Sequence, residues 1–201
     1  MDELALIFEA EMIAFPPRLP EQPIFYPVLN QGYAEQIARD WNTQTSPFAG
    51  YVTEFEIPAE LGETFARHVV GARMHEELWV PAEDLGSFND ALTAPIRVVR
   101  AFFGSSFRGH IPSGFGLRGK SAMEQFQVMA GTRTYSGMDF LLESRANRLS
   151  IFLNFPFWVA AEACDLGVDE EEKSKTLHAM EAALDDHLGP AELLWDAECV
   201  A

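Results

Sequence analysis

The chain has 201 residues, of which 48% are hydrophobic and 16 are Phe, so we expect a folded protein with a sizeable core. Its net charge of −17 would repel phosphate backbones, which argues against nucleic-acid binding and suits either simple solubility or a basic protein partner. No apolar run is long enough to cross a bilayer, the first four residues lack the basic start of a signal peptide, and two cysteines cannot form a disulfide framework. A cytoplasmic location away from membranes is therefore expected.

The first half of the chain is predicted to be rich in strands. Apolar residues at helical spacing predict a helix over residues 3–11, and the proline-dense stretch 15–23 must run extended. Asn30 is a good cap for a second helix over residues 33–41, and residues 83–89 read as a turn. The expected strands, each an alternating or apolar run ending at a breaker, cover residues 24–29, 51–57, 75–81 and 96–103.

The second half is predicted to mix helices with a hairpin. Ser121-x-x-Glu124 is a capping box for a helix that ends near Gly131, and Asp169-x-x-Glu172 opens a last helix that closes at Gly189-Pro190. Residues 138–142 and 149–155 read as two strands joined by a turn. Glycine and serine crowd residues 104–119, which marks a loop or linker there.

These elements predict an α+β fold, with a split antiparallel sheet followed by a helix–hairpin–helix unit. The expected division is residues 1–104, a linker over residues 105–119, and a second α+β unit of unknown type over residues 120–201.

The segment over residues 75–81 carries an unusual set of side chains. On a strand, His75, Glu77 and Trp79 point one way, while Leu78 and Val80 point the other. A carboxylate beside an imidazole and an indole suits a site for a cationic or flat aromatic ligand. The pattern suits an edge strand with one solvated face equally well.

Arg18 lies in the middle of the stiff proline-rich segment. A stiff backbone lowers the entropy lost when a side chain is held in place, so Arg18 is either a prepositioned ligand for an anion or an ordinary surface residue.

Residues 114–121 match the P-loop pattern, with Lys120 and Ser121 in the last two positions. A functional P-loop should spring directly from a buried strand, and here a polar segment intervenes, so we expect a solvated Lys120 and a helix cap rather than a nucleotide site. The five histidines show no spacing typical of zinc ligands, and no metal is predicted. A Ser-His-Asp constellation is neither supported nor excluded.

Five segments between residues 15 and 103 together form a recognisable set. They are Phe15-Pro16-Pro17-Arg18-Leu19-Pro20, Ile24-Phe25-Tyr26-Pro27-Val28-Leu29-Asn30, Tyr33-Ala34, Gly50-Tyr51-Val52-Thr53 and Glu77-Leu78-Trp79-Val80-Pro81. They resemble small bacterial proteins labelled ADP-ribosylation/crystallin J1, and the order of elements is similar to an ADP-ribosyltransferase fold. Residues 120–201 are outside this resemblance.

The resemblance implies an NAD site with defined residues. Glu77 takes the position of the catalytic glutamate, which holds a ribose hydroxyl and stabilises the oxocarbenium that develops as nicotinamide leaves. Tyr26 would pack on the nicotinamide side, and His75 and Arg18 would complete the binding of NAD.

Two departures from the family pattern leave the activity open. No strand carrying Arg or His precedes the helix over residues 3–11, and His75 stands where Gln or Glu is usual. The leading hypothesis is an NAD-binding ADP-ribosyltransferase-like protein, active or degenerate. The alternatives are a non-enzymatic acidic interaction module, such as an immunity or antitoxin-type inhibitor, and a P-loop nucleotide binder.

Overall fold

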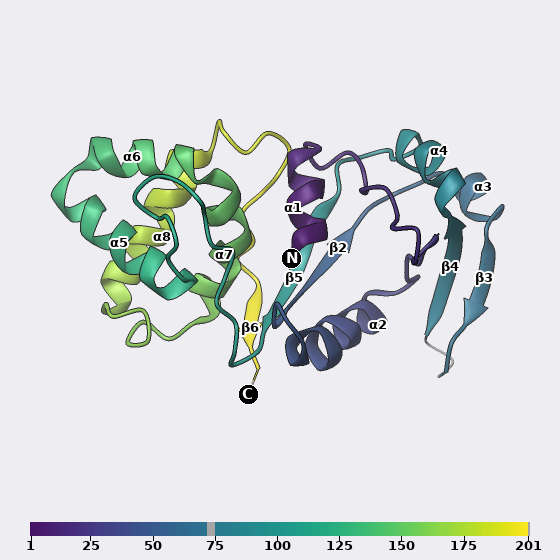
Figure 1. Cartoon of the computed structure of the whole chain (residues 1–201), viewed down its shortest axis with the longest axis horizontal. Helices are drawn as coiled ribbons and strands as arrows, with labels where there is room; N and C mark the ends of the chain where they lie inside the picture. Colours follow the sequence, from purple (N-terminus) through teal and green to yellow (C-terminus); the bar gives the residue numbers. More distant parts are fainter. Residues whose placement is uncertain (72–74, 201) are drawn as a thin grey trace.

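The computed structural model of the protein describes residues 1–71 and 75–200. Four helices gather on one side of the molecule, and two small sheets make up the middle and the other side (Figure 1). This separation of helices from mostly antiparallel sheets is the α+β class that the sequence predicts. Within the described residues, no helix is long and apolar enough to span a membrane.

The strands form two three-stranded sheets. The first sheet has the order β1-β4-β3 and the second has the order β2-β5-β6. All pairs are antiparallel except β5 and β6, which run parallel and depart from the antiparallel arrangement that we expected. The bounds are β1 Ile24–Phe25, β2 Ala49–Glu54, β3 Ala66–Val69, β4 Glu76–Pro81, β5 Arg97–Phe103 and β6 Ala197–Cys199.

Short helices connect the strands. Asn30 caps α2 by accepting a hydrogen bond from the backbone N–H of Tyr33 (2.8 Å), as predicted. The expected turn over residues 83–89 is wrong, because Leu85 and Phe88, three residues apart, bury one face of a short helix in the core. The bounds are α1 Asp2–Glu9, α2 Gln31–Gln36, η1 Ile37–Trp41, η2 Asn42–Gln44, α3 Ala59–Gly62, η3 Ala82–Asp84 and α4 Leu85–Asp90.

The second half is helical, and the predicted hairpin is wrong. Residues 138–142 lie in α6 and residues 149–155 lie in α7. The central part of α7 is buried on all its faces, so its sequence is apolar without a helical period and cannot be distinguished from a buried strand. The bounds are α5 Ala122–Tyr135, α6 Gly137–Ala146, α7 Arg148–Ala160 and α8 Glu170–Leu184.

The predicted helix starts are confirmed, but the predicted ends are not. Ser121 and Glu124 form both hydrogen bonds of a capping box at α5, and Asp169 caps α8. However, α5 continues through Gly131 to Tyr135, and α8 ends at Leu184, before Gly189. Residues 105–119 contain neither helix nor strand, in agreement with the predicted loop.

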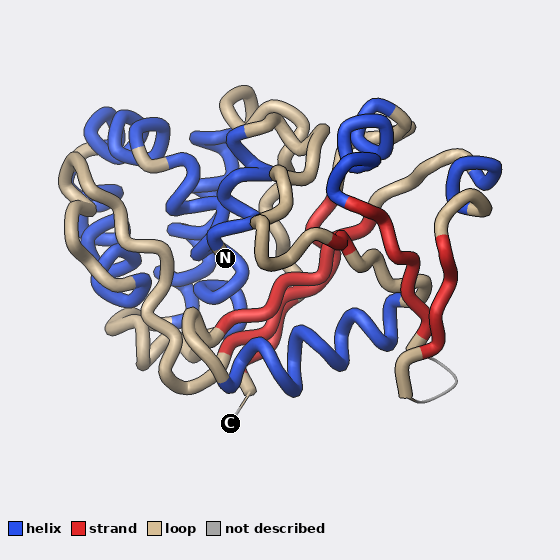
Figure 2. The backbone as a smooth tube through the Cα atoms, turned by 45° about the vertical axis from the view of Figure 1, so that its right-hand side comes forward, coloured by secondary structure: helices blue, strands red, loops and turns tan. Residues whose placement is uncertain are grey.

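One cluster of buried side chains continues from the sheets into the helices. It includes Phe88 beneath the first sheet, Leu117 in the glycine-rich loop and Trp158 of α7. The rings of Phe8 in α1 and Phe152 in α7 lie 4.7 Å apart, which joins the two sides directly. Figure 2 shows α1, at the N-terminus, close to the helical side of the molecule.

Candidate functional site

Glu77 lies on the outer face of β4. Leu78 and Val80 are buried in the core, whereas Trp79 is exposed and Glu77 is half-buried, so the alternation predicted for this strand is confirmed. The register places His68 of β3 opposite Glu77 on one side and Val28 opposite it on the other. Glu77 therefore has a paired segment of the chain on each side and does not lie at an edge of the sheet.

Three rings form a row beside Glu77 on this face, with Tyr26 and Trp79 exposed and His68 half-buried. The Trp79 ring meets Tyr26 edge to face, with centroids 5.5 Å apart, and lies 4.0 Å from the ring of His68. We call Tyr26, His68 and Trp79 the aromatic row. Trp79 follows Glu77 by two residues, so the two side chains are neighbours on the same face of the strand. The aromatic row therefore lies next to the carboxylate.

The hydroxyl of Tyr33 orients the Glu77 carboxylate. Tyr33 is buried in α2 and donates from its hydroxyl to Glu77 Oε1 at 3.1 Å. Burial, and then the hydrogen bond to Glu77, raise the pKa of Tyr33, so its phenol stays neutral and keeps donating at neutral pH. A fixed donor of this kind holds a carboxylate in one orientation before any ligand arrives.

His75 belongs to the same cluster. Its ring stacks on Tyr33 with centroids 4.2 Å apart, and its Nε2 lies 3.1 Å from Gln36 Oε1. The structure therefore brings His75 and Glu77 together through Tyr33, a residue for which we had predicted no role in the site.

Arg18 is not brought to this face. Its guanidinium is hydrogen-bonded to Glu3 Oε1 at 2.7 Å and lies 5.9 Å from the centre of the Phe25 ring, with 15% of the side chain exposed. Phe25 pairs with Val80, which is buried, so this contact is on the inner side of the first sheet, opposite to Tyr26. Arg18 here packs α1 against β1.

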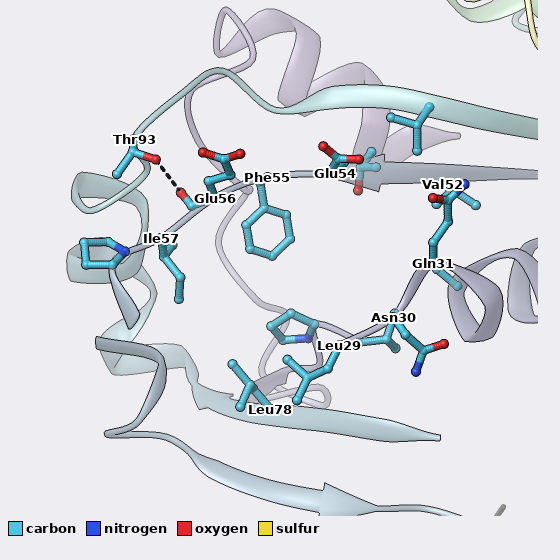
Figure 3. Close-up of a pocket in the computed structure, with 16 residues that line it drawn as sticks. Leu29, Asn30, Gln31, Val52, Glu54, Phe55, Glu56, Ile57, Leu78 and Thr93 are labelled. Carbon is cyan, nitrogen blue, oxygen red and sulfur yellow. Dashed lines mark hydrogen bonds between the residues drawn. The ribbon is translucent and has the colours of Figure 1, made fainter. Parts of the chain in front are cut away.

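A cleft of about 560 Å³ lies between the two sheets. Segment 27–31 and Leu78 form one wall, and residues 52–58 form the other (Figure 3). Phe55 and Ile57 point into the cleft, while the Glu54 carboxylate is hydrogen-bonded to Arg97 at 2.7 Å. Because Leu78 faces the cleft, Glu77 points away from it. The cleft and the predicted catalytic group therefore lie on opposite faces of β4.

The P-loop-like segment is closed on itself. The N–H of Leu117 donates to Glu143 Oε1 at 3.1 Å, so a carboxylate of α6 lies where a phosphate would bind. The next amides also have internal acceptors: Gly119 donates to Pro112 and Ser121 to Glu124. Phosphate binding by such a loop needs these amides, and this geometry does not suit it. The Ser121–Glu124 capping box is present as expected, while Lys120 is half-buried.

A second polar cluster was not predicted from the sequence. His110 Nδ1 lies 2.8 Å from Ser150 Oγ, and the two residues are separated by 40 positions. No spacing rule joins them, and the nearest signal is that Ser150 falls inside an apolar run. Within the described residues, no group of three or more His, Cys, Asp or Glu is arranged to hold a metal ion.

Comparisons with family models, curated proteins and solved structures gave no match to this chain.

Proposed function

We propose that the chain is an ADP-ribosyltransferase-like protein that binds NAD on the outer face of β4, with Glu77 as its catalytic carboxylate. The observation that carries the proposal is the pairing of β1 with β4, which sets the strand of Tyr26 beside the strand of Glu77. The resemblance of residues 15–103 to ADP-ribosyltransferase-like proteins implies these two residues for the same site.

Glu77 has the chemistry that the reaction requires. Tyr33 holds Oε1, and Oε2 would accept a ribose hydroxyl of NAD. When the bond between the ribose and nicotinamide breaks, positive charge develops on the ribose, and a carboxylate fixed nearby stabilises it.

The aromatic row supplies a surface for the nicotinamide. The nicotinamide ring of NAD⁺ is flat and positively charged, and such a ring is attracted to the faces of Trp and Tyr. Arg18 contributes nothing to phosphate binding while Glu3 holds it, so ring contacts and Glu77 carry the affinity, and we expect weak binding.

The test compares Glu77→Gln with Glu76→Gln. Glu76 is a half-buried neighbour on the opposite face of β4 and serves as the matched control. The measurements are the shift of the unfolding midpoint with NAD or ATP, and the release of nicotinamide. NAD should raise the midpoint of unfolding, and ATP should not. Glu77→Gln should slow nicotinamide release by a factor of about 10² to 10³ while Glu76→Gln leaves it unchanged.

The outcomes separate the hypotheses. Equal, nonzero rates in the wild type and Glu77→Gln would remove Glu77 from the reaction. Binding of NAD without nicotinamide release would identify a degenerate member. A midpoint that responds to ATP but not to NAD would favour the nucleotide binder instead.

An acidic interaction module is the second candidate. Within the described residues, ion pairs engage seven carboxylates, although the sequence contains 31 Asp and Glu. Such a surface attracts a basic partner and speeds association at low salt. No response to NAD in any variant would make this candidate the better account.

A further inference from the structure

Three buried polar side chains converge on His110. The side-chain amide of Asn154 accepts from the backbone N–H of His110 at 2.7 Å and donates to its carbonyl at 3.0 Å. Gln125 donates to the same carbonyl at 2.8 Å, and both amides are fully buried. Burying polar groups costs stability unless each is hydrogen-bonded. Here the buried amide of α5 and the buried amide of α7 both hydrogen-bond to the backbone of His110 and hold it in place.

The third buried residue is Ser150, and its hydroxyl meets the imidazole. Ser150 Oγ lies 2.8 Å from His110 Nδ1, with only 3% of the serine exposed. Both residues line a cavity of about 410 Å³, which is separate from the cleft between the sheets. The hydrogen-bonded pair of Ser150 and His110 therefore borders a space that a small molecule could enter.

The first turn of α7 lines the same cavity. Residues 147–150 contribute to its wall, and Asn147 makes no side-chain hydrogen bond as the cap of α7. The first amides of a helix have no carbonyl partner within that helix, so they are donors suited to a negatively charged oxygen. They lie in the same turn as the serine hydroxyl.

The rim of the cavity carries a strained residue. Phe115 has φ +57, which is uncommon for a bulky side chain, and it is 73% exposed while lining the cavity. Strained backbone concentrates at ligand-binding and catalytic sites. The site thus has a fixed imidazole, a bonded hydroxyl, amide donors and an exposed ring at its entrance.

We propose that Ser150 and His110 form a nucleophile–base pair that reacts with small carboxylic esters, in a site independent of Glu77. In the tautomer with its proton on Nε2, His110 accepts the hydroxyl proton at Nδ1 while Oγ bonds to the carbonyl carbon. The first-turn amides of α7 bind the resulting oxyanion. The bond to the alkoxy oxygen then breaks, and the proton passes from His110 to the leaving alcohol. Water repeats the sequence on the acyl-serine and releases the acid.

The charge state of His110 suits a base. Burial lowers the pKa of His110, partly opposed by Asp2 and Glu9 of α1, while Arg148 of α7 lines the same cavity. A lowered pKa leaves the imidazole neutral, and able to take a proton, at neutral pH. The reaction rate should rise with pH through the pKa of His110, which burial places below its ordinary value, and should level off above that pKa.

A fluorophosphonate probe tests the pair on the full chain. The probe bonds its phosphorus to an activated serine oxygen and releases fluoride, so intact mass and peptide mapping locate the label. We expect a label on Ser150 in the wild type, none in Ser150→Ala, and a rate lowered by about 10² or more in His110→Gln. Ser174→Ala is the matched control, because Ser174 Oγ lies 3.5 Å from His178 Nδ1 on the exposed side of α8, outside the cavity, and its loss should not affect labelling.

The proposal is overturned if the folded wild type takes no label, or if Ser150→Ala is labelled as fast as the wild type. It is also overturned if a folded His110→Gln reacts at the wild-type rate, since Ser150 would then act without a base. If His110→Gln fails to fold, the pH profile of wild-type labelling replaces it, and a rate that does not fall at low pH contradicts the role of His110. Hydrolysis of p-nitrophenyl acetate should follow the same order of variants.

Discussion

At Glu77, the hydroxyl group of Tyr33 donates a hydrogen bond that orients the carboxylate. The carboxylate is half-buried, and Tyr33 is the donor that the structure gives to its Oε1. Removal of the hydroxyl would leave a partly desolvated negative charge with a weaker hydrogen-bond set. Hydrogen bonds to charged groups contribute more to the free energy of unfolding than those between neutral groups. The loss of this one contact should therefore be measurable.

We expect Tyr33→Phe to lower the free energy of unfolding by about 1–2 kcal/mol, since the ring still stacks on His75 and only the hydrogen bond is lost. Chemical denaturation at neutral pH measures the difference. Tyr135→Phe is the control, because Tyr135 is 89% exposed and its change should be close to zero. Equal effects in both variants would show that the bond to Glu77 contributes nothing.

Residues of the Glu77 site could be found from the sequence only where the pattern was local. The alternation over residues 75–81 correctly separated Glu77 and Trp79 from the buried Leu78, because adjacent strand residues point to opposite faces. His110 and Ser150 could not be paired, because their contact arises from the packing of α7 against a loop 40 residues away. Arg18 was misleading for the same reason, since its partner Glu3 comes from α1.

Among the elements, β2 and the π-helical turn η1 approach each other closely at Gly50. A Cβ added to Gly50 would lie 2.2 Å from the carbonyl oxygen of Ala38, so backbone meets backbone with no room for a side chain. This contact packs the segment after α2 against the second sheet. A neighbouring backbone cannot yield as a flexible side chain can.

Two glycine substitutions should therefore have opposite signs. We expect Gly50→Ala to destabilise the protein by about 1–3 kcal/mol, because η1 must move away from β2. Gly86→Ala, in the exposed part of α4 with nothing within 4 Å, should stabilise it by about 0.5–1 kcal/mol through helix propensity. Thermal unfolding of both variants checks the pair. A neutral Gly50→Ala would mean that η1 adjusts freely.

Helix starts were predictable because capping is a matter of neighbouring residues, as at Ser121 and Asp169. Whether residues 149–155 form a strand or a helix was not predictable, since a segment buried on all sides loses the amphipathic period that separates the two. The surrounding helices, and not the segment itself, decide its structure.

At the scale of the whole molecule, the buried cluster joins what the sequence divides. Leu4, Phe88, Phe126 and Trp158 belong to one cluster, although they fall in the expected units 1–104 and 120–201. β6 also returns from the C-terminal region to pair with β5. Neither unit buries its apolar surface without the other.

We therefore expect a single unfolding transition in calorimetry, with equal calorimetric and van't Hoff enthalpies. Intrinsic tryptophan fluorescence and far-UV circular dichroism should give the same midpoint. Two resolved transitions would instead support independent domains on either side of residues 105–119.

The parallel pairing of β5 with β6 has a consequence for synthesis. The ribosome makes β2 and β5 early, yet residues 104–196 must follow before the strand that completes their sheet exists. Throughout that interval, one edge of β5 offers its peptide groups to any other nascent or misfolded chain. The sheet is thus finished late in translation, and slower elongation over the helical region would lengthen its exposure to aggregation.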